Sequence, residues 1–190
     1  MPIKIAIKSV KQSYVPTLEI LHMMQTFRHI VNDSIRLGLQ QDVSSMKKLC
    51  QLSYKGTAKY SIVNYYRLCA ISKAAGILAN RKKTIKRGHQ TKNPYMKKPL
   101  LISCYGFKLK DDSLRVPLGN RQYFDIPLSN HTKRVLESDP RIGIRSFTLT
   151  PNTLSICFVK QVEEITSNCS WNRQKSFKYY YWQFRECHPV

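Results

Sequence analysis

The chain has 190 residues, of which 32 are Lys or Arg and 11 are Asp or Glu, so its formal net charge is +21. Hydrophobic residues make up 42% of it, which excludes wholesale disorder, and the length allows one domain or two small ones. No apolar run reaches the roughly 18 residues of a membrane-spanning helix, so we expect none. Residues 1–8 lack the apolar core of a secretory signal, so we expect no such signal.

The first half of the chain is predicted to hold one strand followed by three helices. Apolar residues alternate with charged or small ones over residues 3–10, which predicts a strand. An apolar stripe at spacings of three and four residues predicts a helix over residues 16–38. A short helix is expected at Met46–Leu52, and Gly56-Thr57 leads into a third helix that ends in the cations Arg81–Arg87.

After Pro99 the hydrophobic period changes to that of short strands bounded by turn residues. Strands are predicted at residues 100–104, 106–109, 114–118, 123–128, 144–150 and 153–159. Pro151-Asn152 joins the last two in a hairpin, and Pro117 and Pro127 indicate edge positions or strand ends. We expect the first strand to join the same sheet, which makes the helices an insertion within it.

These elements predict an α+β fold: a small antiparallel β-barrel or sheet, wedge-like in form, with an inserted three-helix bundle. The β domain is expected to comprise residues 1–12 and 99–165. The helical insertion, with its basic segment, is expected over residues 13–98. Residues 166–190 are interpreted as an irregular tail.

The positive charge is concentrated in one part of the chain. Between Asp42 and Asp111 there is no acidic residue, yet 16 of the 32 basic residues lie there. Because Lys and Arg gain affinity by releasing counterions from phosphates, this pattern predicts a nucleic-acid partner. An anionic membrane surface is the weaker alternative, because Gly88, Pro94 and Pro99 interrupt an amphipathic helix.

Residues 59–98 interleave cations with aromatic side chains. Aromatic rings stack on bases while cations follow the nucleic-acid backbone. Tyr66 lies on the apolar stripe of its helix, so we expect it in the core. The candidate nucleic-acid-binding residues are Lys59, Tyr60, Arg67, Lys73, Arg81, Lys82, Lys83, Lys86, Arg87, Lys92, Tyr95, Lys97 and Lys98.

The sequence shows no catalytic constellation. Asp111-Asp112 and Asp139-Pro140 are typical of turns, and Glu163-Glu164 on a strand would point to opposite faces. No Cys-x-x-Cys pair occurs, and the cysteines at positions 50, 69, 104 and 157 are interpreted as small core or half-buried residues. We therefore expect a binding protein with no enzyme activity of its own, no metal and no other cofactor.

Several loose motifs follow one another in a defined order. They are the opening strand, Phe27-Arg28-x-x-x-Asn32, a helix beginning Lys59-Tyr60, Lys97-Lys98-Pro99, Leu114-Arg115-Val116-Pro117 and the hairpin 147–160. In this order they resemble the N-terminal half of the transposon-encoded TnpB (OrfB) proteins, which are RNA-guided DNA endonucleases, over roughly residues 1–165. The resemblance implies a wedge-like β domain with a helical recognition insertion that binds guide RNA and target DNA. It also implies that Lys59, Tyr60 and Val63 face the short DNA motif beside the target.

The RuvC-like nuclease of that family opens with Gly-Ile-Asp, whose Asp binds catalytic metal, whereas here the corresponding place reads Ser167–Asn172. The tail contains both tryptophans, Trp171 and Trp182. A shift of the reading frame by one nucleotide converts each Trp codon into a Gly codon, and the first shifted stretch permits Gly-Ile-Asp-Arg-Asn-Leu. We therefore interpret the tail as out of frame.

The expectation that follows is a truncated, frameshifted TnpB-like protein of a mobile element. Such a chain would bind guide RNA and target DNA, lack the nuclease and have no membrane association. A mobile-element origin implies a prokaryotic cytoplasm, with association to the nucleoid as an option. The alternative is a free-standing basic RNA- or DNA-binding protein, such as a repressor or an RNA chaperone.

Overall fold

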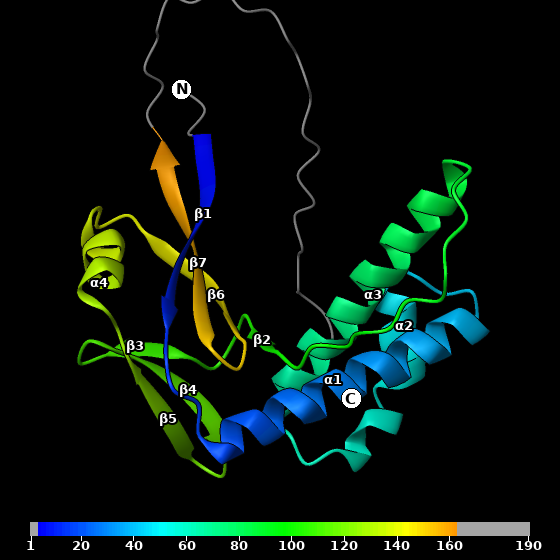
Figure 1. The fold of residues 1–190 in the computed structure, drawn as a ribbon, viewed down its shortest axis with the longest axis horizontal. Helices are drawn as coiled ribbons and strands as arrows, with labels where there is room; N and C mark the ends of the chain where they lie inside the picture. The colour runs from blue at the N-terminus through cyan, green and yellow to red at the C-terminus, as the bar shows by residue number, and fades with distance from the viewer. Residues whose placement is uncertain (1–3, 163–190) are drawn as a thin grey trace, which may run out of the picture.

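The protein has an α+β fold in which most helices gather at one end and two antiparallel sheets at the other (Figure 1). The computed structural model describes residues 4–162, so the predictions for the tail, residues 166–190, lie outside the described residues. The helices are α1 (Leu18–Gln40), α2 (Met46–Ser53), the 3₁₀ turn η1 (Gly56–Lys59), α3 (Asn64–Lys86) and α4 (Asn130–Glu137). The strands are β1 (Lys4–Ser13), β2 (Leu101–Ser103), β3 (Lys108–Lys110), β4 (Ser113–Gly119), β5 (Gln122–Pro127), β6 (Gly143–Leu149) and β7 (Thr153–Val162).

The larger sheet joins the first and last described strands, in the order β1-β7-β6-β2. β1 pairs antiparallel with β7 along its whole length, from Lys4 opposite Val162 to Ser13 opposite Thr153. β6 and β7 form the predicted hairpin, whose turn is closed by a hydrogen bond from the Thr150 amide to the Thr153 carbonyl. The first strand thus lies in the sheet as predicted, and α1, α2 and α3 are inserted between β1 and β2.

The smaller sheet has the order β3-β4-β5, and the strands described here form two open sheets rather than the barrel that the sequence left as one option. β2 and β3 are three residues long, and each pairs with a single neighbour, so neither joins the two sheets into a closed ring. Pro117 lies where the β4–β5 register shifts, and Pro127 is the last residue of β5. Both positions tolerate the missing amide donor of proline.

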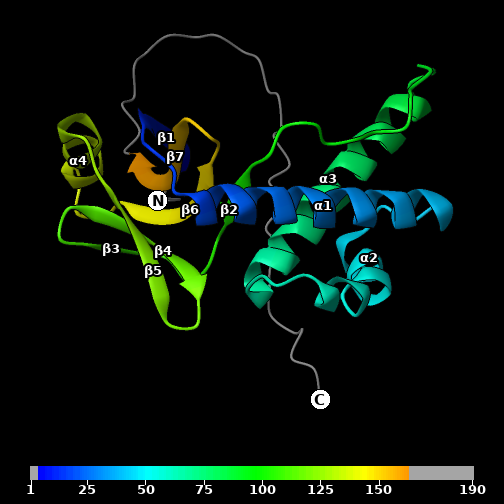
Figure 2. The same cartoon turned by 60° about the horizontal axis from the view of Figure 1, so that its bottom comes forward.

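The helical end is held together by the apolar stripe of α1. Thr17 caps the helix by accepting a hydrogen bond from the Ile20 amide, and Phe27 and Val31 are fully buried. α1 packs against α3, and α2 contacts both (Figure 2). Tyr66 on α3 is buried as predicted and donates from its hydroxyl to the Pro117 carbonyl at 3.0 Å, which ties the helices to the smaller sheet. None of the helices in the described range is long and apolar enough to cross a membrane.

The start of the third helix was predicted too early. η1 ends at Lys59, the backbone is extended at Tyr60 and non-helical at Val63, and α3 begins only at Asn64. The β-branched side chains of Ile62 and Val63 favour extended backbone, which explains the break. The prediction of a helix that begins at Lys59-Tyr60, which is one motif of the TnpB resemblance, is therefore wrong.

The structure also contains a helix, α4, that the hydrophobic pattern did not predict. It is eight residues long, and Ser129 caps it by accepting a hydrogen bond from the Thr132 amide at 3.2 Å. Only Thr132 within it is buried. A helix this short has too few buried positions to produce a readable period, although Ser129 was a capping signal.

Candidate nucleic-acid interface

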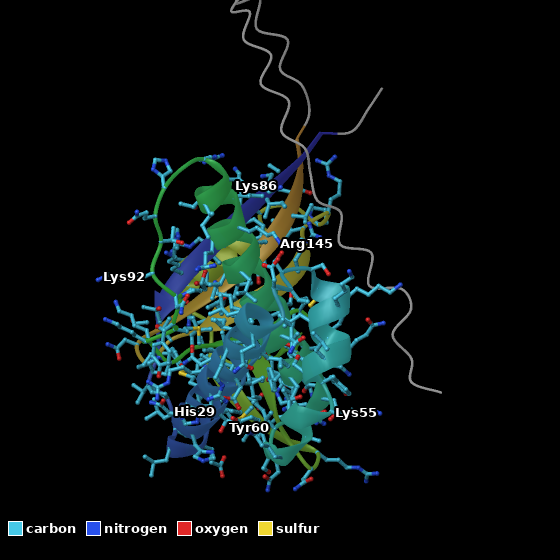
Figure 3. All side chains as sticks on the ribbon, turned by 90° about the vertical axis from the view of Figure 1, so that its right-hand side faces the viewer. His29, Lys55, Tyr60, Lys86, Lys92 and Arg145 are labelled. Carbon is cyan, nitrogen blue, oxygen red and sulfur yellow. The ribbon has the colours of Figure 1, made fainter. Side chains whose placement is uncertain are left out.

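The predicted binding residues divide between the two ends of α3. This helix has 23 residues, so its ends lie about 34 Å apart at a rise of 1.5 Å per residue. Lys59, Tyr60 and Val63 precede its first turn, whereas Lys82, Lys83, Lys86 and Arg87 lie at its C-terminal end. Figure 3 shows Lys86 and Tyr60 at opposite ends of the view, so the two groups are not one compact site.

The group at the N-terminal end of α3 is engaged in contacts within the protein. The Tyr60 hydroxyl donates to Asp33 Oδ2 at 2.6 Å, and Lys59 Nζ lies 3.1 Å from the same oxygen. Val63 is half-buried against the hydrophobic core. Arg67 donates to the Asn64 side chain, and its guanidinium lies 5.4 Å from the centre of the Tyr54 ring. Lys59 and Tyr60 thus fasten η1 and the residue after it to α1, and Arg67 contacts the residue that follows α2.

Asp33 is the centre of this group. Burial alone would raise the pKa of its carboxyl, but the hydrogen bond from Tyr60 and the charges of Lys59 and Arg36 outweigh burial and lower that pKa. Burial and the same hydrogen bond raise the pKa of Tyr60 to about 12. The carboxylate and the protonated phenol therefore form one stable pair at neutral pH, between α1 and the residue after η1.

We expect Tyr60→Phe to raise the pKa of Asp33 and to lower the free energy of unfolding at neutral pH by about 1 kcal/mol, because the charged acceptor loses one donor. Asp33 has a lowered pKa in the folded state, so its contribution is present above the pKa of the unfolded chain and is lost as the pH falls through the folded value. The stability difference between variant and wild type should therefore shrink under acidic conditions. Carboxyl NMR titration and denaturant unfolding at neutral and acidic pH measure both effects.

Tyr95→Phe is the matched control, because Tyr95 is 63% exposed and the substitution removes the same hydroxyl from a surface position. It should leave both the Asp33 titration and the unfolding free energy unchanged. An unchanged Asp33 pKa in Tyr60→Phe would contradict the role of the Tyr60 hydroxyl.

The second group forms a protruding basic arm, defined here as residues 81–98, which comprises the last turns of α3 and the segment that returns toward β2 (Figures 1 and 2). Its exposed cations are Lys82, Lys83, Lys86, Arg87, Lys92, Lys97 and Lys98, and Arg81 is half-buried. Arg81 donates to the Asn93 side chain at 3.2 Å, and Lys82 forms an exposed ion pair with Asp42, also at 3.2 Å. Lys73 is exposed on α3 between the two groups.

The returning segment of the basic arm is fastened to α1 by two polar side chains. The Asn32 side chain accepts a hydrogen bond from the Met96 amide at 2.8 Å and donates to the Met96 carbonyl at 3.1 Å. One turn earlier, Arg28 donates to the Lys97 carbonyl at 3.1 Å. The Phe27-Arg28-x-x-x-Asn32 motif therefore binds the backbone at and beside the Lys97-Lys98-Pro99 motif, two segments far apart in the sequence.

We expect Asn32→Ala to release this segment while the core stays folded. The substitution removes both hydrogen bonds to Met96, and a loss of about 1.4 kcal/mol corresponds to tenfold faster amide exchange. Hydrogen exchange should show at least that increase at the Met96 amide, together with faster tryptic cleavage at Lys92. Asn80→Ala, on the surface of α3, should change neither. Unchanged protection of Met96 in Asn32→Ala would contradict the clamp.

An open pocket of about 510 Å³ lies between α1 and the returning segment. His29, Asp33 and Arg36 line it from α1, and Tyr60 and Tyr95 supply aromatic rings. Tyr60 is held by Asp33, whereas Tyr95 is exposed. Of these two rings, Tyr95 is the one that presents a face for stacking on an unpaired base.

Sequence reasoning missed the acidic partners of the predicted cations. Asp33 and Asp42 lie at or before the start of the acid-free stretch, and only the packing of α1 against α3 and its neighbours brings them beside Lys59 and Lys82. Across residues 4–162, no three His, Cys, Asp or Glu side chains come together as a metal site would require. No protein-family model matches the chain, and the comparison with curated proteins found no match either.

Proposed function

We propose that this protein binds nucleic acid through the basic arm. The observation that carries the proposal is the exposure of seven cations within residues 82–98, a segment that contains no acidic residue. Ordinary protein surfaces mix both signs of charge, and a protruding surface of one sign attracts polyanions. Tyr95 adds an exposed ring to the same segment, on which a base of single-stranded nucleic acid can stack.

RNA is the partner that we favour. DNA is the second partner, as the target strand that pairs with the guide RNA. The order of one strand, a helical insertion and two small sheets is compatible with the binding half of a TnpB-type protein. The contact between the Arg28–Asn32 and Lys97–Pro99 motifs supports the same proposal, because it gives both motifs one structural role. We assign guide-RNA and target-DNA binding to this chain, in a prokaryotic cytoplasm or on the nucleoid, and no cleavage of its own.

The test is a fluorescence anisotropy titration of the full chain with a hairpin RNA and with duplex DNA at several salt concentrations. If four or more phosphates are contacted, log Kd should rise with log salt with a slope of about 3 or more. Kd should stay below about 1 μM near physiological salt for the preferred ligand, which is tighter than non-specific binding. Salt-independent or undetectable binding would overturn the proposal. Target DNA incubated with the chain, RNA and Mg²⁺ should remain intact.

One observation favours the free-standing binding protein as the second candidate. β1 and β7 pair along their full length, so the larger sheet joins the two ends of residues 4–162, and the helices and the smaller sheet lie between them in the sequence. Deletion of residues 168–190 separates the two candidates. Unchanged affinity supports the TnpB-type remnant, whereas a clear loss of affinity shows that the tail belongs to a free-standing binder.

A further inference from the structure

Two cysteines from distant parts of the sequence meet at the junction of the helices and the larger sheet. Cys69 is buried on α3, which packs against β2, and Cys104 is the first residue after β2. Both line one pocket of about 330 Å³, together with Lys73 and Tyr105. Cys104 is exposed, which corrects its interpretation as a core or half-buried residue.

The two thiols that line this pocket influence each other's pKa. Hydrogen bonding from the Cys69 thiol, together with the positive charge of Arg145, lowers the pKa of Cys104 against the opposing effect of burial. The same bond and burial raise the pKa of Cys69. Cys104 therefore has the greater thiolate character, and the buried Cys69 thiol keeps its proton. An exposed nucleophilic thiol beside a second thiol is the arrangement of redox-sensitive cysteines.

Packing alone does not account for this pair. At position 69, packing is a sufficient explanation, because the small side chain of cysteine fills space in the core beside the buried residues Tyr66 and Ala70. Cys104, in contrast, is exposed at the pocket wall, where its sulfur contributes to no core. Packing therefore does not require a thiol at position 104.

We propose that Cys69 and Cys104 are a peroxide-reactive thiol pair that closes into a disulfide between α3 and the end of β2. The Cys104 thiolate attacks one oxygen of hydrogen peroxide, the O–O bond breaks, and the released hydroxide takes up a proton to become water. The resulting sulfenic acid then reacts with the Cys69 thiol, the S–O bond breaks as the S–S bond forms, and a second water leaves. Two thiols are thereby oxidised, and one peroxide is reduced to two waters.

The disulfide would enclose residues 69–104, a stretch that contains the entire basic arm. The bond would join α3 to the end of β2, at positions that flank the basic arm in the sequence. It would not involve the exposed cations of the arm. The proposal concerns the thiols alone, so it does not depend on nucleic-acid binding and is tested separately from it.

The experiment uses the full chain carrying Cys169→Ser and Cys187→Ser, which removes the two cysteines outside the described residues. The reduced protein is treated with hydrogen peroxide in slight excess, its remaining thiols are alkylated, and tryptic peptides are mapped by mass spectrometry. We expect an intact mass about 2 Da lower before alkylation, because two hydrogens are lost. The peptides should show Cys69 linked to Cys104, with Cys50 and Cys157 alkylated.

Two further variants identify the role of each sulfur. Cys69→Ala should leave Cys104 as a sulfenic acid that dimedone traps, and Cys104→Ser should abolish the mass loss. Cys157→Ser, at a half-buried position on β7, is the matched control and should leave the mass loss unchanged. Recovery of both Cys69 and Cys104 as alkylated thiols, or a link from Cys104 to another cysteine, would overturn the proposal, and the peptide map gives this answer even if a variant fails to fold.

Discussion

Replacement of Lys82, Lys83, Lys86 and Arg87 by Gln is expected to weaken RNA binding roughly 100-fold near physiological salt, because several phosphates are then no longer neutralised. These side chains are exposed at the end of α3, so the change leaves the core untouched. The slope of log Kd against log salt should also fall by about 3, since each neutralised phosphate contributes about 0.7–0.9 to it. Anisotropy titrations of wild type and variant over several salt concentrations measure both quantities.

The matched control removes the same amount of charge from the other end of the molecule. Lys8 and Lys11 on β1, Lys108 on β3 and Arg121 in the β4–β5 turn all lie away from the basic arm. Their replacement by Gln changes the net charge equally, yet it should cost less than about threefold in affinity, because only long-range attraction is reduced. Equal reductions of affinity in the two variants would show that net charge, rather than the basic arm, determines binding.

Only part of the candidate interface could be predicted from the sequence. The acid-free stretch between Asp42 and Asp111 predicted an exposed basic surface, and the basic arm is exposed because charged side chains seldom enter a core without partners. The sequence did not show that the predicted residues divide between the two ends of α3. Tyr60 is held by Asp33, 27 positions earlier, and that contact exists only once α1 has packed against its neighbours.

The fold was likewise predictable only where the sequence signals are local. The α1 helix and the β6–β7 hairpin were predicted because long periodic patterns and a Pro-Asn turn are local signals. The break before α3 depends on a few residues, Tyr60 to Val63, and α4 buries too little for a period to show. The separation into two sheets is a matter of which strand pairs with which, and hydrophobic alternation carries no information on partners.

Phe27→Ala should be the most destabilising single substitution in the helical insertion. Phe27 is fully buried in the middle of α1, and truncation of a buried Phe side chain costs about 3–5 kcal/mol through lost transfer energy and the cavity left behind. With a total stability of about 5–15 kcal/mol, that cost removes a large share of the folding free energy. Thermal unfolding followed by circular dichroism should show a melting temperature lower by about 10 °C.

Leu18→Ala tests whether burial, rather than any removal of apolar surface from α1, causes this effect. Leu18 is the first residue of the same helix, but its side chain is 84% exposed, so its truncation should stay within about 0.5 kcal/mol of wild type. The basic arm depends on the same packing, because Asn32 and Arg28 hold it to the helix that Phe27 anchors. Near its melting temperature, Phe27→Ala should therefore lose RNA affinity in parallel with its helical signal, whereas Leu18→Ala should retain both. A Phe27→Ala protein as stable as Leu18→Ala would mean that α1 is not packed as described. It would also contradict the attachment of the basic arm to α1.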